Sequence, residues 1–134
     1  MLWLLVKEQY SGVAEDVGEA SDGQTIIVRA HRRDTARALI TERTRAIVLV
    51  TPNNPGGVEY PADLVRAFYD LARNNGLRLI VDETYRDFDS RSGAPHDLFS
   101  DPDWADTLIL LYSFSKAYRL TGHRVGAMVA SETL

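Results

Sequence analysis

Three short segments of the sequence hold side chains that could carry out chemistry. Asn54 lies in a turn of sequence PNNPGG, Asp82 begins a segment of sequence DETY, and Lys116 ends a segment of sequence SFSK. A primary amine can attack a carbonyl carbon or move a proton, and a carboxylate can hold a proton on a neighbouring nitrogen. Taken singly, these residues are more typical of a turn, a helix cap and a solvated surface position.

Each of these segments follows an apolar run that is typical of a buried strand. The expected strands, separated by segments with helical periodicity, are Thr25 to Arg29, Ala46 to Thr51, Leu77 to Val81 and Thr107 to Tyr112. This alternation predicts an α/β fold with three layers, a mostly parallel sheet with helices on both faces. Ligands of such sheets bind beyond the carboxyl ends of the strands, so Asn54, Asp82 and Lys116 are expected to converge on one crevice.

Two helices are expected between these strands. Asp34 is a candidate N-cap for a short helix. A longer helix is predicted to start at Pro61, to run to about Asn74 and to be closed by Gly76, because proline suits a first helical turn and glycine suits a left-handed end. The residues expected to face inward are Ala36, Leu39 and Ile40 in the short helix, and Leu64, Val65, Phe68, Leu71 and Ala72 in the long one.

The composition is that of one ordinary globular domain. The chain has 134 residues, of which 45% are apolar and 25% charged, with a net charge of -4. The sequence contains no cysteine, which excludes disulfides and thiol chemistry. Its longest apolar runs are about six residues, against the roughly 18 that cross a bilayer. With its arginines scattered, we expect a cytoplasmic protein that binds neither membrane nor nucleic acid.

The amino-terminal residues fit the strand and helix pattern less well. Met1 to Val6 is typical of a strand that begins without a turn or a cap, and Glu8 to Glu19 has weak helical periodicity. We therefore expect the chain to begin inside a fold.

Several other residues are expected to have structural roles. The histidines have no metal-ligand spacing, so no metal site is expected and a surface position is predicted for His31, His96 and His123. Packing is the expected role of both tryptophans, Trp3 and Trp104. Glu83 beside Asp82 could suggest a pair of catalytic carboxylates, but adjacent residues of an extended segment point to opposite faces.

Taken together, the three segments resemble the pyridoxal-phosphate core of class I and II aminotransferases, the aspartate-aminotransferase-like enzymes of fold type I. The matching elements are Asn54-Pro55-Gly56-Gly57, Asp82-x-x-Tyr85, and Ser113-x-Ser115-Lys116 with Arg124 eight residues on. The resemblance covers Thr25 to Ser131. Gly56 replaces the threonine of the family's usual Asn-Pro-Thr-Gly, which changes a turn residue rather than a cofactor contact.

The resemblance implies the central chemical roles for Lys116 and Asp82. Lys116 would form a Schiff base with the aldehyde of pyridoxal 5'-phosphate, and would then serve as the base that moves a proton at the substrate α-carbon. Asp82 would pair with the pyridine nitrogen and keep it protonated, so that the ring can withdraw negative charge.

Binding roles are implied for the other matching residues. Asn54 and Tyr85 would hydrogen-bond the phenolic oxygen of the cofactor ring. Ser113 and Arg124 would bind the phosphate, since a planar guanidinium can hold two phosphate oxygens at once. Ser115 would either help to bind the phosphate or only pack.

The implied activity is the transfer of an amino group between an amino acid and a 2-oxo acid, in amino acid metabolism and biosynthesis. A pyridoxal-phosphate-dependent lyase or decarboxylase of the same fold, and a truncated non-catalytic remnant, stay as alternatives. A doubly wound nucleotide binder is disfavoured because neither G-x-G-x-x-G nor a P-loop follows any expected strand.

The resemblance also bears on the extent of the chain. Residues 1–134 are expected to be part of a large, cofactor-binding domain, with an amino-terminal segment and a carboxyl-terminal small domain absent. We expect a homodimer for the full-length protein and no activity for these residues alone.

Overall fold

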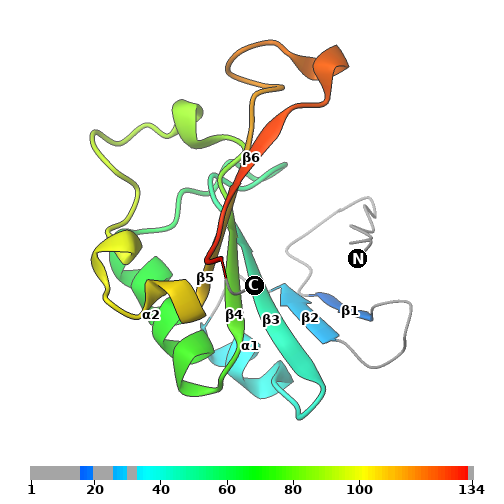
Figure 1. The fold of residues 1–134 in the computed structure, drawn as a ribbon, viewed down its shortest axis with the longest axis vertical. Helices are drawn as coiled ribbons and strands as arrows, with labels where there is room; N and C mark the ends of the chain where they lie inside the picture. The colour runs from blue at the N-terminus through cyan, green and yellow to red at the C-terminus, as the bar shows by residue number, and fades with distance from the viewer. Residues whose placement is uncertain (1–15, 20–25, 30–32, 133–134) are drawn as a thin grey trace.

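The computed structural model describes residues 16–19, 26–29 and 33–132, and Figure 1 shows their arrangement. They form one six-stranded sheet with two α-helices. The strands are β1 (Asp16–Glu19), β2 (Ile26–Arg29), β3 (Thr44–Val50), β4 (Arg78–Asp82), β5 (Leu108–Ser113) and β6 (Gly126–Val129). The helices are α1 (Arg33–Leu39) and α2 (Ala62–Asn74), and short 3-10 turns are η1 (Arg86–Phe88), η2 (Leu98–Ser100), η3 (Trp104–Asp106) and η4 (Thr121–His123).

The strands lie in the sheet in the order of the chain, β1-β2-β3-β4-β5-β6. The four from β2 to β5 are parallel to one another, whereas β1 and β6 pair antiparallel with their neighbours. All four strands predicted from the apolar runs are confirmed, with ends that differ by one or two residues. The α/β class is therefore confirmed.

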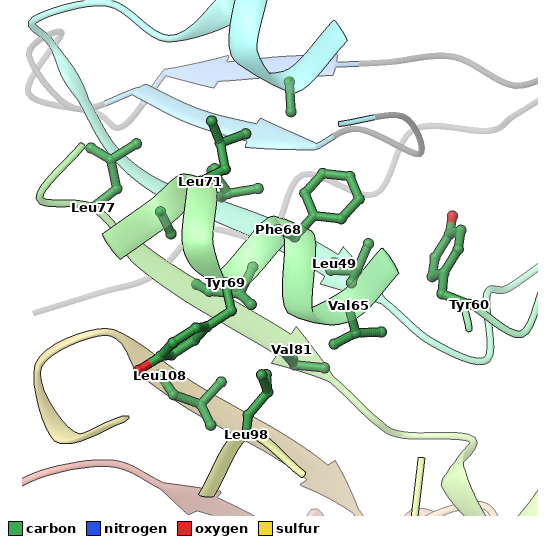
Figure 2. Packing of buried hydrophobic residues seen from close by; sticks show 14 residues of the cluster. Leu49, Tyr60, Val65, Phe68, Tyr69, Leu71, Leu77, Val81, Leu98 and Leu108 are labelled. Carbon is green, nitrogen blue, oxygen red and sulfur yellow. The ribbon is translucent and has the colours of Figure 1, made fainter. Parts of the chain in front are cut away.

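Both α-helices of the described residues cover the same face of the sheet, rather than one face each. Residues from α1 and α2 share a single core cluster with β3, β4 and β5, and Figure 2 shows α2 lying over these strands. The strand order explains this arrangement. From β2 to β5, each strand lies next to the one before it, so the chain moves across the sheet in a single direction. Because each crossover is right-handed, crossovers that all move in one direction place their helices on the same face.

The inward stripe predicted for α2 is confirmed, with one addition. The buried residues of the predicted stripe are Val65, Phe68, Leu71 and Ala72, and Leu64 is partly buried. Tyr69, which the prediction did not include, is fully buried as well. The Tyr69 hydroxyl reaches the edge of the core and donates to Asp101 Oδ1 at 3.1 Å. Burial of its ring, together with this hydrogen bond, raises the pKa of Tyr69.

The helix ends differ slightly from the sequence prediction. Pro61 is the N-cap of α2 rather than its first residue, and Gly76 follows the helix with a left-handed φ of 64°, as its position predicts. The assignment of Asp34 as an N-cap is wrong, because it lies within the first turn of α1. A carboxylate there still faces the positive end of the helix. Ala36 of α1 is buried in the core, as expected.

The helix indicated by the weak periodicity of Glu8 to Glu19 is wrong for the last four residues of that segment. Asp16–Glu19 is a strand, paired antiparallel with β2, because partners along a sheet edge outweigh a weak local period. Other sequence predictions fall on residues outside the described ones. They are the strand over Met1 to Val6, the rest of the weakly periodic segment, and the roles of Trp3 and His31.

The face of the sheet opposite the two helices is apolar and only partly covered by the described residues. Val48, Ile80 and Ile109 lie side by side on it across three strands, and the outer two are half-buried. On the edge strand β6, Met128 is 68% exposed. None of the helices described is long and apolar enough to cross a membrane.

Candidate active site

The carboxyl ends of β3, β4 and β5 lie side by side at the same end of the sheet. Asp82, the last residue of β4, stands between Val50 of β3 and Leu111 of β5 in the strand register. Its carbonyl accepts a hydrogen bond from the Thr51 N–H at 3.0 Å, and the next N–H, of Glu83, donates to the Leu111 carbonyl at 2.8 Å. The loops that follow these strands therefore start from neighbouring points.

Side chains from the three loops meet at Tyr85. Asn54 Nδ2 donates a hydrogen bond to the Tyr85 hydroxyl at 2.9 Å, although the two residues are 31 positions apart. The Lys116 amine lies over the ring of Tyr85, with its Nζ 5.6 Å from the ring centroid. The loops after β3, β4 and β5 thus bring an amide, a phenol and an amine together.

The turn that carries Asn54 is fixed by its own backbone. The Asn53 N–H donates to the Val58 carbonyl at 2.8 Å, and the Gly57 N–H donates to the Asn53 carbonyl at 2.7 Å. Gly57 adopts a left-handed φ of 65°, which a side chain would strain. A Cβ at Gly56 would lie 3.4 Å from Asn53 Oδ1, an ordinary van der Waals contact, so this position does not require glycine.

Asp82 presents one carboxylate oxygen to its own turn and leaves the other available. Its Oδ1 accepts hydrogen bonds from the Thr84 N–H at 2.9 Å and the Thr84 hydroxyl at 2.7 Å. Such a closed Asx turn holds the half-buried carboxylate in one orientation. Among the described residues no donor reaches Oδ2, so this oxygen can accept a hydrogen bond from a protonated group of a ligand.

Ser113 and Arg124 are brought near each other by the β5–β6 pairing. Ser113 pairs with Gly126, and the Phe114 N–H donates to the Val125 carbonyl at 3.2 Å. Arg124 precedes this pairing in a left-handed conformation, and its guanidinium donates to the Thr121 carbonyl at 3.1 Å. The guanidinium is exposed and keeps further N–H groups free for an anion.

Gly126 is a residue whose type the pairing requires. A Cβ there would lie 2.7 Å from the backbone carbonyl oxygen of Tyr112, closer than such atoms approach. The glycine that follows Arg124 by two positions therefore allows β6 to pack against β5, beside the candidate anion site.

A polar contact that the sequence reasoning missed joins β5 to the turn after β4. The Tyr112 hydroxyl donates to the carboxylate of Asp87. This acceptor stabilises the protonated phenol and raises the pKa of Tyr112 to about 12. No spacing rule connects a strand residue with a loop residue of this kind, so only the fold could show the pair.

The surface position predicted for His96 is wrong. Its side chain is 4% exposed, and its Nε2 lies 3.1 Å from Oε1 of Glu83, which is fully buried. The segment after η1 folds back over the end of β4, and a buried carboxylate there needs a polar partner. His123 is exposed, as predicted. Trp104 packs against the core and meets Phe99 edge to face, as expected for a packing residue.

The described residues also line an open cavity of about 550 Å³ that is separate from this site. It lies at the amino ends of β4 and β5, and Arg45, Arg73 and Arg78 line it with Asp103 and Asp106. None of the residues described above at the carboxyl ends of the strands contributes to it.

Comparison with known proteins agrees with the class that the fold and site define, an α/β protein with an amine, a carboxylate and an amide–phenol pair at the carboxyl ends of parallel strands. The family model described as aminotransferase class I and II matches residues 5–134. The chain belongs to this family.

Individual relatives and structures show how much of the family's length the chain represents. An aspartate aminotransferase from Sulfolobus acidocaldarius is 33% identical over 95 residues, which are 71% of this chain and 24% of the relative. An arginine–pyruvate transaminase from Pseudomonas aeruginosa is 39% identical over 99 residues, or 72% and 24%. The chain therefore spans about a quarter of the length of these relatives.

Solved aminotransferases share the fold of the described residues. A mutant aspartate aminotransferase from Thermus thermophilus, complexed with tryptophan, superposes with a TM-score of 0.65 at 28% identity, covering 76% of this chain and 26% of that one. An aminotransferase from Escherichia coli superposes with a TM-score of 0.62 at 38% identity, covering 75% and 24%.

Proposed function

We propose that this chain is the cofactor-binding core of a pyridoxal-phosphate-dependent aminotransferase, which transfers an amino group between an amino acid and a 2-oxo acid. The observation that carries the proposal is the meeting of Asn54, Tyr85 and Lys116 from three loops at the carboxyl ends of parallel strands. Membership of the aminotransferase family supports the same reaction.

The polar groups at the site fit pyridoxal phosphate. Asp82 Oδ2 is an open acceptor for the protonated pyridine nitrogen, and the Asn54–Tyr85 pair offers donors for the phenolic oxygen. Ser113 and Arg124, joined through the β5–β6 pairing, offer a hydroxyl and a guanidinium for the phosphate. The donor set therefore matches both the charge and the hydrogen-bonding pattern of the cofactor.

Two residues would do the chemical work. When bound, pyridoxal phosphate supplies an electron-withdrawing ring that stabilises negative charge at the substrate α-carbon. Lys116 Nζ contacts no carboxylate among the described residues, so the amine is available to bond to the cofactor aldehyde and then to carry a proton. Asp82, fixed by Thr84, would hold the proton on the pyridine nitrogen through its negative charge.

The surroundings of Lys116 orient its amine. Its Nζ lies over the Tyr85 ring, which attracts a cation through its π face without accepting the proton itself. Asn54 donates a hydrogen bond to the hydroxyl of the same ring. The ring is thereby kept where it can orient the amine.

We extend the proposal to the setting of this core. Residues 1–134 would belong to the large, cofactor-binding domain, which accords with the share of the relatives that the chain spans. The full-length protein would act as a cytoplasmic homodimer in amino acid biosynthesis. Sedimentation of the purified full-length protein would test the homodimer, and imaging of a tagged copy in cells would test the cytoplasmic location.

The activity is tested with the full-length protein that contains this chain. Lys116→Arg keeps the positive charge but cannot bond to the cofactor aldehyde, so amino transfer should fall by about 10²- to 10⁴-fold with every pair of amino acid and 2-oxo acid tried. Lys7→Arg is the matched control, because Lys7 is the other lysine of the chain. Equal activity of Lys116→Arg and the control would refute the proposal.

A further inference from the structure

A buried polar cluster lies directly behind the turn that carries Asp82 and Tyr85. Glu83 is fully buried, and its Oε2 accepts a hydrogen bond from Arg86 Nη1 at 3.1 Å. Its Oε1 lies 3.1 Å from His96 Nε2. Among the described residues neither atom has a hydrogen-bond partner, so the two lie in close polar contact without an aligned hydrogen bond. The proposed function uses none of these side chains.

The hydrogen bonds of His96 define how it faces the carboxylate. Its Nδ1 accepts the Leu98 N–H at 3.2 Å and therefore cannot carry a proton of its own in this arrangement. The ring proton then lies on Nε2, and this nitrogen is 3.1 Å from Glu83 Oε1. His96 thus comes from a separate segment of the chain and contacts the carboxylate oxygen that Arg86 does not hold.

The backbone connects this cluster to the site. Glu83 donates its N–H to the Leu111 carbonyl at 2.8 Å, and its carbonyl accepts the Arg86 N–H at 3.0 Å. The Arg86–Glu83 side-chain bond therefore spans the same turn that the backbone closes. Tyr85 lies inside this turn and Asp82 immediately precedes it. A movement of Glu83 would therefore shift both site residues.

Burial makes the Glu83 carboxylate sensitive to the loss of either partner. A buried charge that loses a hydrogen-bonding partner is destabilised by more than the pair contributes when it is complete. Arg86 is 44% exposed, so water partly screens its contribution, whereas His96 is buried with the carboxylate. His96 is therefore the partner that holds Glu83 from inside the protein.

We propose that His96 is a positioning residue, which holds Glu83 and thereby fixes the turn that places Tyr85 against Asn54 and Asp82 beside the cofactor. The effect of this pair on cofactor binding rests on the proposed function. The position of Tyr85 itself does not, because the Asn54–Tyr85 contact is formed by the protein alone.

The first test needs no cofactor. In full-length protein labelled with 3-fluorotyrosine, the fluorine resonance of Tyr85 is assigned by its loss in Tyr85→Phe. His96→Leu should shift or broaden this resonance, and His96→Gln, whose amide can donate to Glu83, should restore it. The matched control is Asp97→Asn, which removes the neighbouring ion pair with Arg66 but no contact to Glu83.

The second test uses protein loaded with pyridoxal phosphate. His96→Leu should raise the dissociation constant of the cofactor by about tenfold, which is about 1.4 kcal/mol, while His96→Gln and Asp97→Asn stay near the wild-type value. A wild-type protein that binds no cofactor would refute the proposed function. The fluorine spectra would still decide on the positioning role.

An unchanged Tyr85 resonance in a folded His96→Leu protein would overturn the inference. If this variant does not fold, His96→Asn replaces it, because its shorter side chain keeps a polar group in the buried position but withdraws it from Glu83 Oε1. The Tyr85 resonance should then shift in His96→Asn, and an unchanged resonance there would equally overturn the inference.

Discussion

Gly126→Ala should separate β6 from β5 and disturb the candidate phosphate site. The added Cβ would stand 2.7 Å from the Tyr112 carbonyl oxygen, whereas real Cβ atoms keep at least 3.0 Å from such atoms. The position of a Cβ is fixed by its own backbone, and the oxygen belongs to the backbone of the paired strand, so no side chain can rotate away to relieve the contact. The strand itself has to move, at the point where Gly126 pairs with Ser113.

The expected cost follows from this overlap. Forcing one extra methyl group into a packed position costs about 1–3 kcal/mol, and weakening one ladder hydrogen bond adds about 1 kcal/mol. We therefore expect Gly126→Ala to lower the free energy of unfolding by about 2–4 kcal/mol. Because Arg124 precedes the displaced strand, the affinity for pyridoxal phosphate should fall as well.

Gly122→Ala is the matched control for this prediction. Gly122 lies in η4 of the same connection, a Cβ there would have no neighbour within 4 Å, and its φ is not left-handed. Urea unfolding of the two full-length variants, followed by titration with pyridoxal phosphate, measures both effects. If Gly126→Ala is as stable as Gly122→Ala and binds the cofactor equally well, the close approach of β6 to β5 is refuted.

Three further predictions concern the proton transfer, the packing of the core and the stability of the fold at alkaline pH. Asp82→Asn should leave pyridoxal phosphate bound but slow the removal of the substrate α-proton by well over tenfold, which is more than about 1.4 kcal/mol; an unchanged single-turnover rate would contradict the assigned role. Phe68→Ala should cost about 3–5 kcal/mol in urea unfolding, because Phe68 is fully buried, whereas Phe88→Ala, at a side chain that is 60% exposed, should cost far less. The pKa of Tyr112 is raised from 10.0 to about 12 by its hydrogen bond to Asp87. The folded protein therefore holds this proton after the unfolded chain has lost it, so the contribution to stability is complete below pH 10 and is lost as the pH rises towards 12. Tyr112→Phe should flatten that part of the alkaline unfolding profile, and an identical profile would contradict it.

The sequence predicts most of this fold because the parallel strands are buried on the helix face and read as apolar runs. The same physics explains the misses. Tyr69 is missed from the inward stripe because a tyrosine can bury its ring and still present its hydroxyl to a polar group, here Asp101. The strand Asp16–Glu19 is missed because its conformation depends on pairing with β2 rather than on a local period.

The candidate site is predicted less evenly than the fold. The contact between Asn54 and Tyr85 follows from where parallel strands end, a rule that needs only the order of the elements. The burial of His96 against Glu83 could not be predicted, because it depends on how a long irregular segment folds back after β4. The sequence offers one indication: a glutamate directly after a buried strand needs a polar partner from elsewhere in the chain.

The proposed function depends most on Lys116 being the amine that holds the cofactor. The most direct measurement is to load the full-length protein with pyridoxal phosphate, to reduce it with borohydride so that the bond to the holding amine becomes permanent, and to map the labelled peptide. We predict a label on Lys116, in the segment that follows β5. A label on Lys7, on a lysine elsewhere in the full-length protein, or on no residue at all would contradict it.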